Sequence, residues 1–251
     1  MAKTTILIPI LNYEETLEDV LQKTKGLSDE TLVVCDITMP EMEERIRSWL
    51  GGLESSYGLH VLYRTTERGY GSAVRFGFSH ANGDIVVVMT GDSSDEPKTV
   101  PKMISAIEKG ADIVCGTRFS KGGGIVGSIF KERIARNISL LMRMLSRTHT
   151  FDATNGFRAY RTKVARSIKT RENSFAFNIE MLVKAAESGC KIGEVPAIWY
   201  NRLSGRPNFQ VKKEGKAYAK WTFYAISKMP STATKLLCLL IILALISFGL
   251  T

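Results

Sequence analysis

Apolar and polar positions from residue 4 to residue 116 follow two periods that alternate along the chain. Short apolar runs bounded by turn residues are typical of buried strands, and apolar residues three or four apart are typical of amphipathic helices. The runs predict strands at 6–9, 31–35, 60–63, 84–89 and 112–116. The helical spacing predicts helices at 14–24, 42–50, 71–81 and 97–109, of which the second is stopped by Gly51 and Gly52. This alternation predicts an α/β fold with a doubly wound, mostly parallel, Rossmann-like sheet.

Beyond residue 117 the pattern weakens: a glycine loop at 122–124 precedes a basic helix at 131–147. Near the end, lysines and aromatic residues such as Trp221 are mixed as in a helix at a membrane interface. An almost purely apolar tail follows. The predicted parts are a main domain at 1–210, an amphipathic juxtamembrane segment at 211–230 and an apolar membrane helix at 231–251.

The apolar tail predicts attachment to a membrane. Residues 236–250 are fifteen residues without a charge and measure about 22 Å as a helix, less than a hydrocarbon core of roughly 30 Å. A helix that begins at Ser231 adds about 7 Å, so a single crossing and an interfacial anchor both stay open. A buried core helix is the third alternative. Because basic residues gather before the tail, the positive-inside rule places the main domain on the cytoplasmic face.

Composition narrows the class of protein. The chain has 251 residues, 44% of them hydrophobic, and a formal net charge of +9. Its four cysteines are too far apart to indicate a zinc site or a disulfide framework, and residues 1–5 lead directly into a strand without a signal peptide. The charge suits anionic lipid or phosphorylated substrates. A nucleic-acid partner is disfavoured, because the charge precedes an apolar tail and no binding module is recognised.

A carboxylate-rich turn follows the fourth predicted strand. Asp92, Asp95 and Glu96 crowd negative charge at the carboxyl end of that strand, where open α/β sheets bind ligands. Carboxylates beside Ser and Thr hydroxyls suit Mg²⁺ or Mn²⁺ better than zinc, and such an ion also holds substrate phosphates. The alternative is an acidic cap of the next helix, with Ser94 or Asp95 at the cap position.

Two further carboxylates follow the first two predicted strands. The first strand leads into Asn12, Tyr13 and Glu14, and the second ends at Asp36. A carboxylate there accepts hydrogen bonds from a ring N–H or a sugar hydroxyl, as in nucleoside recognition by α/β sheets. The alternative for Glu14 is a role at the start of the next helix.

Several motifs occur in an order that resembles a known family. They are Arg68-Gly69-Tyr70-Gly71-Ser72-Ala73, Gly116-Thr117-Arg118-Phe119, Gly122-Gly123-Gly124, Asp152-Ala153-Thr154-Asn155-Gly156-Phe157-Arg158, Phe177-Asn178-Ile179-Glu180-Met181 and Ile192-Gly193-Glu194-Val195-Pro196. With the amino-terminal motif Pro9-Ile10-Leu11-Asn12-Tyr13-Glu14 they resemble family 2 glycosyltransferases of the GT-A fold, and within that family dolichyl-phosphate mannose synthases and their polyprenyl-phosphate relatives. The resemblance covers about residues 4–228.

The resemblance implies a metal-dependent, inverting transfer of a sugar from a nucleotide sugar to a polyprenyl or dolichyl phosphate at the cytoplasmic membrane face. Mannose from GDP-mannose is expected, and a UDP-sugar such as UDP-glucose is the alternative. The implied donor contacts are Pro9, Leu11, Tyr13, Glu14, Asp36, Arg68, Thr90, Gly91 and Asp92. The implied ligands of Mg²⁺ or Mn²⁺ are Asp92, Ser94 and Asp95. The implied acceptor or phosphate contacts are Arg118, Lys131, Arg133, Arg202 and Arg206, and the catalytic set is Asp92, Arg118 and Arg133.

The chain departs from the family pattern at the metal motif and in the basic helix. Thr90-Gly91-Asp92 stands where the family has Asp-x-Asp, so Asp92 is expected to be the principal ligand, and Thr90→Asp is expected to preserve or raise activity. Glu132 stands where mannose synthases place a phosphate-binding arginine, which moves that expectation to Arg133. An anionic-lipid contact is the alternative for the other arginines of this helix, Arg136 and Arg143.

These departures keep a second class of protein open, a non-catalytic membrane partner of the same fold. A processive polysaccharide synthase is disfavoured, because the Gln-x-x-Arg-Trp signature is missing from the sequence.

Overall fold

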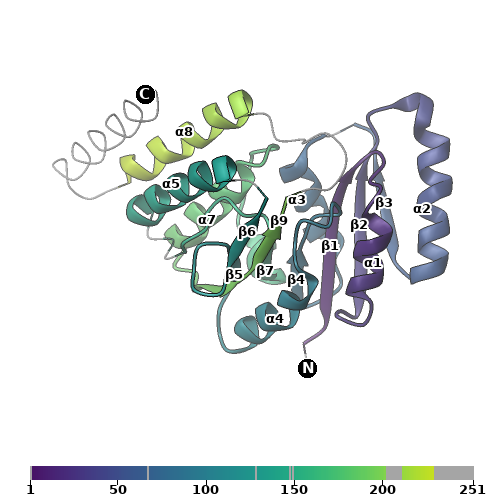
Figure 1. Ribbon diagram of the computed structural model, residues 1–251, viewed down its shortest axis with the longest axis horizontal. Helices are drawn as coiled ribbons and strands as arrows, with labels where there is room; N and C mark the ends of the chain where they lie inside the picture. The colour runs from purple at the N-terminus through teal and green to yellow at the C-terminus, as the bar shows by residue number, and fades with distance from the viewer. Residues whose placement is uncertain are drawn as a thin grey trace.

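The computed structural model describes residues 2–66, 68–127, 129–146, 148, 150–201 and 211–228. Its main sheet has seven strands in the order β3-β2-β1-β4-β7-β5-β8 (Figure 1). These strands are β1 (Thr4–Leu11), β2 (Glu30–Asp36), β3 (His60–Arg64), β4 (Ile85–Val88), β5 (Ile113–Thr117), β7 (Arg158–Arg161) and β8 (Ile192–Pro196). All neighbours are parallel except β7, which is antiparallel to β4 and β5. A separate parallel pair consists of β6 (Gly124–Val126) and β9 (Ile198–Tyr200).

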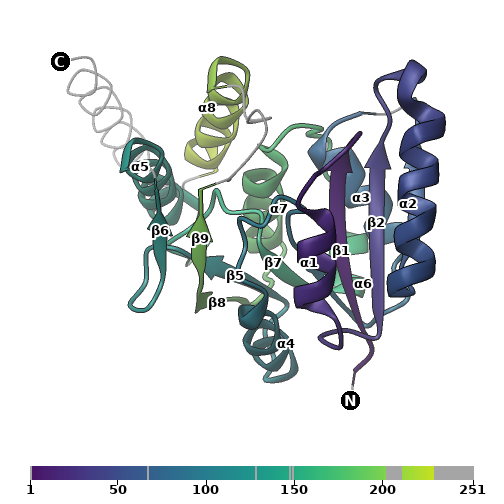
Figure 2. The ribbon, with the colours of Figure 1, turned by 45° about the vertical axis from the view of Figure 1, so that its right-hand side comes forward.

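Helices cover both faces of the main sheet (Figure 2). They are α1 (Leu17–Thr24), α2 (Glu43–Tyr57), α3 (Tyr70–His80), α4 (Val100–Glu108), α5 (Ile129–Ser146), α6 (Thr162–Ser167), α7 (Phe177–Glu187) and α8 (Val211–Ser227). Successive side chains of a strand point to opposite faces, so Leu7 enters one core while Ile6 and Ile8 enter the other. The first core contains residues of α3, α6, α7 and α8, and the second contains residues of α1, α2 and α4. The prediction of a mostly parallel α/β sheet is thereby confirmed.

The strand order reverses between β1 and β4. From β1 the chain moves outward to β2 and β3 and then returns to β4 on the other side of β1. Loops that leave the carboxyl ends on either side of such a point diverge, and open α/β sheets bind ligands in the crevice between them. The segment after β1 and the acidic turn after β4 flank this point.

The predicted stop of the second helix at Gly51 and Gly52 is wrong, because α2 continues through both residues to Tyr57. An interior glycine costs about 1 kcal/mol relative to alanine. Leu50 and Leu53 are buried in the core on either side of the pair, and their burial outweighs that cost. The helix ends at Gly58, which has a left-handed φ of 65° and donates its N–H to the Glu54 carbonyl.

The predicted juxtamembrane segment packs against the domain along α8. Tyr218 and Trp221 are only 7% and 5% exposed in the core shared with α7, whereas Phe223 is 54% exposed. Tyr218 and Trp221, which the sequence assigned to a membrane interface, are therefore internal. Among the helices that the structure describes, none is long and apolar enough to span a bilayer. The predicted membrane helix at 231–251 lies outside the described residues.

Candidate active site

The acidic turn after β4 rests directly on the end of β1. A Cβ atom on Gly91 would lie 2.9 Å from a methyl carbon of Ile10 and 3.5 Å from the Glu14 side chain, so only glycine lets the turn lie this close. The Thr16 hydroxyl donates a hydrogen bond to the Gly91 carbonyl at 3.0 Å and lies 3.4 Å from Glu14 Oε1. The structure thus brings together Glu14 and Gly91, two of the predicted donor contacts.

Asp95 closes the acidic turn from inside. Its Oδ2 accepts hydrogen bonds from the Thr90 N–H at 2.8 Å and from the Thr90 hydroxyl at 2.9 Å. Burial raises the pKa of Asp95 to about 7; the Asp92 charge acts in the same direction, and the bonds from Thr90 oppose it. The alternative of a helix cap is wrong, because the following 3₁₀ turn begins after Glu96 and has no side-chain cap.

Asp92 and Ser94 offer oxygen atoms that suit a divalent ion. Asp92 is half-buried, and its Oδ1 accepts the Ser94 N–H at 3.1 Å. The Ser94 hydroxyl is buried without a hydrogen-bond partner, which leaves an oxygen available as a ligand. Within the described ranges no three His, Cys, Asp or Glu residues lie close enough to hold a metal by themselves. Mg²⁺ and Mn²⁺ fit such a sparse site, because they keep waters and bind substrate phosphates as well.

Asp36 holds a loop in place at the carboxyl end of β2. Its two carboxylate oxygens accept hydrogen bonds from Arg64 at 2.7 and 3.0 Å, and both side chains are buried. Its Oδ2 also accepts the Gly69 N–H at 2.8 Å. The contact of Asp36 with a base or ribose stays a prediction, and its observed contacts position the loop that carries the exposed Arg68.

The end of β1 presents an aromatic side chain at the same edge of the sheet. Asn12 has a left-handed φ of 54°, and its side-chain amide forms two hydrogen bonds of 2.7 Å with Thr38. The next residue, Tyr13, is 50% exposed, and its ring lies 4.4 Å from the Trp49 ring between centroids. Leu11 is 39% exposed beside it, whereas Pro9 lies within the β1 ladder. Tyr13 and Leu11 are therefore the accessible predicted donor contacts from β1.

Arg118 is held rigidly at the carboxyl end of β5. Its Nε and Nη2 donate to the two oxygens of Asp152 at 2.6 and 2.8 Å, and Nη2 also donates to the Thr154 hydroxyl at 2.8 Å. Burial alone would lower the pKa of Arg118, but the Asp152 carboxylate overcomes it, so the pKa is raised. The charge of Asp95 acts in the same direction, which places the Arg118 guanidinium within electrostatic reach of the acidic turn.

A second arginine, on α5, packs on the same aromatic ring as Arg118. The guanidinium carbons of Arg118 and Arg136 lie 5.3 and 4.9 Å from the centroid of the Phe119 ring. Arg118 and Arg136 thus share one aromatic ring, and Arg133, three residues earlier on α5, is exposed as Arg136 is. Sequence reasoning treated Arg136 as an alternative lipid contact, and only the fold shows its nearness to Phe119.

Three of the predicted acceptor contacts fall outside what the structure describes. Arg202 and Arg206 lie outside the described residues, and the side chain of Lys131 is not described.

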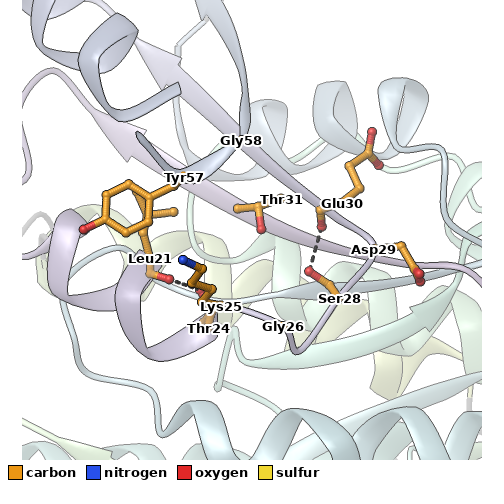
Figure 3. Close-up of a pocket in the computed structure, with 10 residues that line it drawn as sticks. All are labelled: Leu21, Thr24, Lys25, Gly26, Ser28, Asp29, Glu30, Thr31, Tyr57 and Gly58. Atoms are coloured by element: carbon orange, nitrogen blue, oxygen red, sulfur yellow. Dashed lines mark hydrogen bonds between the residues drawn. The ribbon is translucent and has the colours of Figure 1, made fainter. Parts of the chain in front are cut away.

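The hollow drawn in Figure 3 lies at the opposite edge of the sheet. It has a volume of about 130 Å³ and includes Asp29 and Glu30, which precede or begin β2. Asp29 accepts the Thr4 N–H at 2.8 Å, and Glu30 accepts the Thr5 hydroxyl at 2.5 Å. Because these carboxylates join β1 to the start of β2, the hollow is a structural feature and not the candidate site.

The bond between Thr90 and Asp95 predicts that Thr90→Asp destabilises the fold. A second carboxylate would face Asp95 where a hydroxyl now donates, so we expect the free energy of unfolding to fall by about 1–3 kcal/mol. Chemical denaturation of the metal-free protein measures this loss. Thr90→Ser retains the donor and is the control. Unchanged stability in Thr90→Asp would contradict the assigned bond.

Comparisons with known proteins identify the family of this chain. The family model described as "Glycosyl transferase family 2" matches residues 5–169. Dolichol-phosphate mannosyltransferase of Pyrococcus furiosus is 30% identical over 232 residues, which are 87% of this chain and 64% of that protein. Undecaprenyl-phosphate mannosyltransferase of Micrococcus luteus is 30% identical over 229 residues, which are 88% of this chain and 93% of that protein.

The fold also matches a solved structure. Glucosyl-3-phosphoglycerate synthase from Mycobacterium tuberculosis, crystallised with Mn²⁺, UDP and glucosyl-3-phosphoglycerate, has a TM-score of 0.64 and 18% sequence identity. The match covers 92% of this chain and 82% of that one. At this level of identity the likeness establishes a shared fold.

Proposed function

The chain belongs to glycosyltransferase family 2, and on this premise we propose that it transfers a sugar from a nucleotide sugar to a polyprenyl or dolichyl phosphate, with inversion. The resemblance to this family and the prediction of a glycosyltransferase enzyme are confirmed by the comparisons. The observation that carries the proposal is that Arg118 and Arg136 both lie over the Phe119 ring, and that Arg118 is near enough to the acidic turn for the Asp95 charge to raise its pKa. Arginines at the same edge of the sheet as a carboxylate-rich turn suit a reaction between two phosphorylated substrates.

Each part of the site answers one requirement of the reaction. A divalent ion held by Asp92 and Ser94 would stabilise the charge that develops on the leaving nucleoside diphosphate. The acceptor phosphate is already anionic, so it needs arginine to bind and orient it and no strong general base. Asp152 keeps the Arg118 guanidinium group in one orientation, as binding of the acceptor phosphate would require.

We propose mannose from GDP-mannose as the donor, and a UDP-sugar such as UDP-glucose as the alternative. The names of the two relatives, both mannosyltransferases, support mannose. The chain spans 64% of the length of the Pyrococcus protein. The dolichol phosphate acceptor in that protein's name is therefore part of the proposal for this chain.

We further propose that the enzyme works at the cytoplasmic face of a membrane. In Figure 1, α5 and α8 lie side by side at the edge far from α2. Leu140 and Met144 on α5 and Phe223 on α8 are each more than half exposed, at 54%, 53% and 54%. Exposed arginines and lysines on the same helices, such as Lys216, suit anionic lipid headgroups.

A donor screen tests the function. The purified full chain is incubated with MnCl₂ or MgCl₂, a polyprenyl phosphate, and labelled GDP-mannose or labelled UDP-glucose. We expect a labelled product that extracts into organic solvent with GDP-mannose and disappears with a chelator. Product from UDP-glucose alone would assign the alternative donor. No product, with no metal-dependent nucleotide binding, would instead indicate the non-catalytic membrane partner.

Arg136→Gln is expected to weaken binding of the acceptor. Loss of the charged hydrogen-bond donor that shares the Phe119 ring with Arg118 should raise the KM for polyprenyl phosphate about tenfold or more, while the KM for the nucleotide sugar changes little. Steady-state kinetics with each substrate varied in turn measure the difference. Arg143→Gln removes the same charge from the same helix, but its guanidinium lies over Phe151, so it is the matched control. Equal effects of the two substitutions would mean that α5 contributes only general positive charge.

A further inference from the structure

Helix α8 is fastened to the domain by two carboxylates at different places. Glu172 Oε1 accepts hydrogen bonds from the Lys220 ammonium at 2.6 Å and from the Trp221 indole N–H at 2.9 Å. Glu187 accepts a hydrogen bond from the Tyr224 hydroxyl at 3.1 Å. The Trp221 ring is buried, whereas Glu187 is exposed. The Glu172 contact is thus the internal one of the two.

The residues around Glu172 form a rigid support, which we call the 171–173 turn. The carboxylate of Glu180 is fully buried and accepts the N–H groups of Arg171 and Glu172 at 2.9 and 2.7 Å. Lys184 donates to the same carboxylate at 2.7 Å and so balances its charge. Glu180 thus fixes the backbone of the turn, while the Glu172 side chain contacts α8.

The other side of this turn supports the start of α3. Arg75 of α3 donates to the Glu172 carbonyl at 2.6 Å, and the Asn173 carbonyl accepts the Gly71 N–H at 2.9 Å. A Cβ on Gly69 would lie 2.4 Å from the Asn173 carbonyl oxygen, and one on Gly71 would lie 2.3 Å from that of Glu172. The glycines therefore let two backbones touch, and a shift of the 171–173 turn must move residues 69–71.

Residues 69–71 in turn border the donor side of the site. The Gly69 N–H donates to Asp36 at the carboxyl end of β2, and the exposed Arg68 precedes it. Three hydrogen bonds, linked by short stretches of backbone, thus join α8 to the end of β2 through Glu172, Asn173, Gly71 and Gly69.

We propose that Glu172 is a positioning residue for the nucleotide sugar. Because Glu172 binds Trp221 and Lys220, the affinity of the donor site for the nucleotide sugar depends on the packing of α8 against the domain. The inference rests on the proposed function, since it needs a nucleotide sugar at the carboxyl ends of β1 and β2. Helix α8 is itself rich in lysine and is followed in the sequence by the apolar tail at 236–250, so this contact couples the donor site to the helix that leads into the tail.

Nucleotide binding by the full chain tests the inference. In calorimetric titrations with GDP and MnCl₂, Glu172→Ala and Trp221→Phe should each raise the Kd about five- to tenfold, within the usual range of coupling between sites. The double variant should be no weaker than Glu172→Ala, because both substitutions cut the same connection. Glu172→Gln keeps an acceptor for the Trp221 N–H and should bind more tightly than Glu172→Ala. In kinetic assays the KM for GDP-mannose should rise, while that for polyprenyl phosphate stays within about twofold.

Glu187→Ala is the matched control, because it removes the Tyr224 contact of α8 without touching the 171–173 turn, and its Kd for GDP should equal that of the wild type. Amide hydrogen exchange adds a readout independent of activity: exchange at Gly71 should accelerate in Glu172→Ala and not in Glu187→Ala. Unchanged GDP binding in Glu172→Ala, or an equal loss in Glu187→Ala, would overturn the inference and leave the proposed function intact. A wild-type chain that binds neither GDP nor UDP would overturn both.

Discussion

Asp92→Ala is expected to lower sugar transfer by about 10³-fold or more, because a metal that stabilises a leaving diphosphate contributes several kcal/mol to catalysis. Asp92 is the accessible carboxylate of the acidic turn, whereas Asp95 is buried and holds Thr90. The loss should lie in kcat and in metal affinity together, with the free energy of unfolding changed by less than about 1 kcal/mol. Lipid-extracted product over a series of MnCl₂ concentrations measures it.

Glu96→Gln is the control for charge in the same turn. Glu96 pairs with Lys98 at 2.6 Å, and the Lys98 side chain is 73% exposed. Such surface pairs contribute little, so activity should stay within about twofold of the wild type. Activity retained in Asp92→Ala would remove the metal assignment, and an equal loss in Glu96→Gln would reduce the role of Asp92 to general negative charge.

The half of the fold before residue 117 follows from local patterns. Its strands are continuous apolar runs such as Ile85–Val88, and a parallel strand buried on both faces has that composition. The position of the acidic turn follows from the same rule, since the loop after a buried strand opens at the carboxyl edge of the sheet.

The later half could not be predicted in this way, because its central strand contains a buried charge. Strand β7 has the sequence Arg-Ala-Tyr-Arg, which does not look like an interior strand. Arg158 is nevertheless 0% exposed, and it donates to the carbonyls of Asn178 and Ala153 at 2.5 and 2.6 Å. Those acceptors come from other segments of the chain, so the periodicity of the sequence does not predict strand β7.

The site was predicted residue by residue but not as a set of partners. The sequence indicates Arg118 by its place after a strand, yet its orientation depends on Asp152, 34 residues later. Asp36 looks like a ligand contact by the same reasoning, and in the fold Arg64 and Gly69 occupy its oxygens. Sequence position identifies a carboxylate at the right edge of the sheet; only tertiary contacts decide whether it faces substrate or supports a loop.

Asp152→Asn should therefore cost both stability and activity. Asp152 is 0% exposed and gives Arg118 its only described carboxylate within hydrogen-bond reach. Removing one partner of a buried ion pair leaves the other charge uncompensated, and we expect the free energy of unfolding to fall by about 3–5 kcal/mol. Chemical denaturation measures the loss. Because Arg118 also loses its fixed orientation, the kcat for sugar transfer should fall under conditions where the variant is still folded.

A double-mutant cycle separates the pair from its surroundings. Arg118→Gln leaves Asp152 as the unpaired charge, so it should be similarly destabilising, and the double variant Arg118→Gln/Asp152→Asn should recover part of the stability because no charge stays buried alone. Glu194→Gln is the control in the same region, since it keeps an acceptor for the Phe151 N–H and the Thr150 hydroxyl. If the losses in free energy of unfolding simply add in the double variant, Arg118 and Asp152 are not coupled. Asp152 would then not be what fixes the orientation of Arg118. If they couple while kcat stays low in the double variant, the pair supports the fold and the Arg118 charge is needed separately for the transfer.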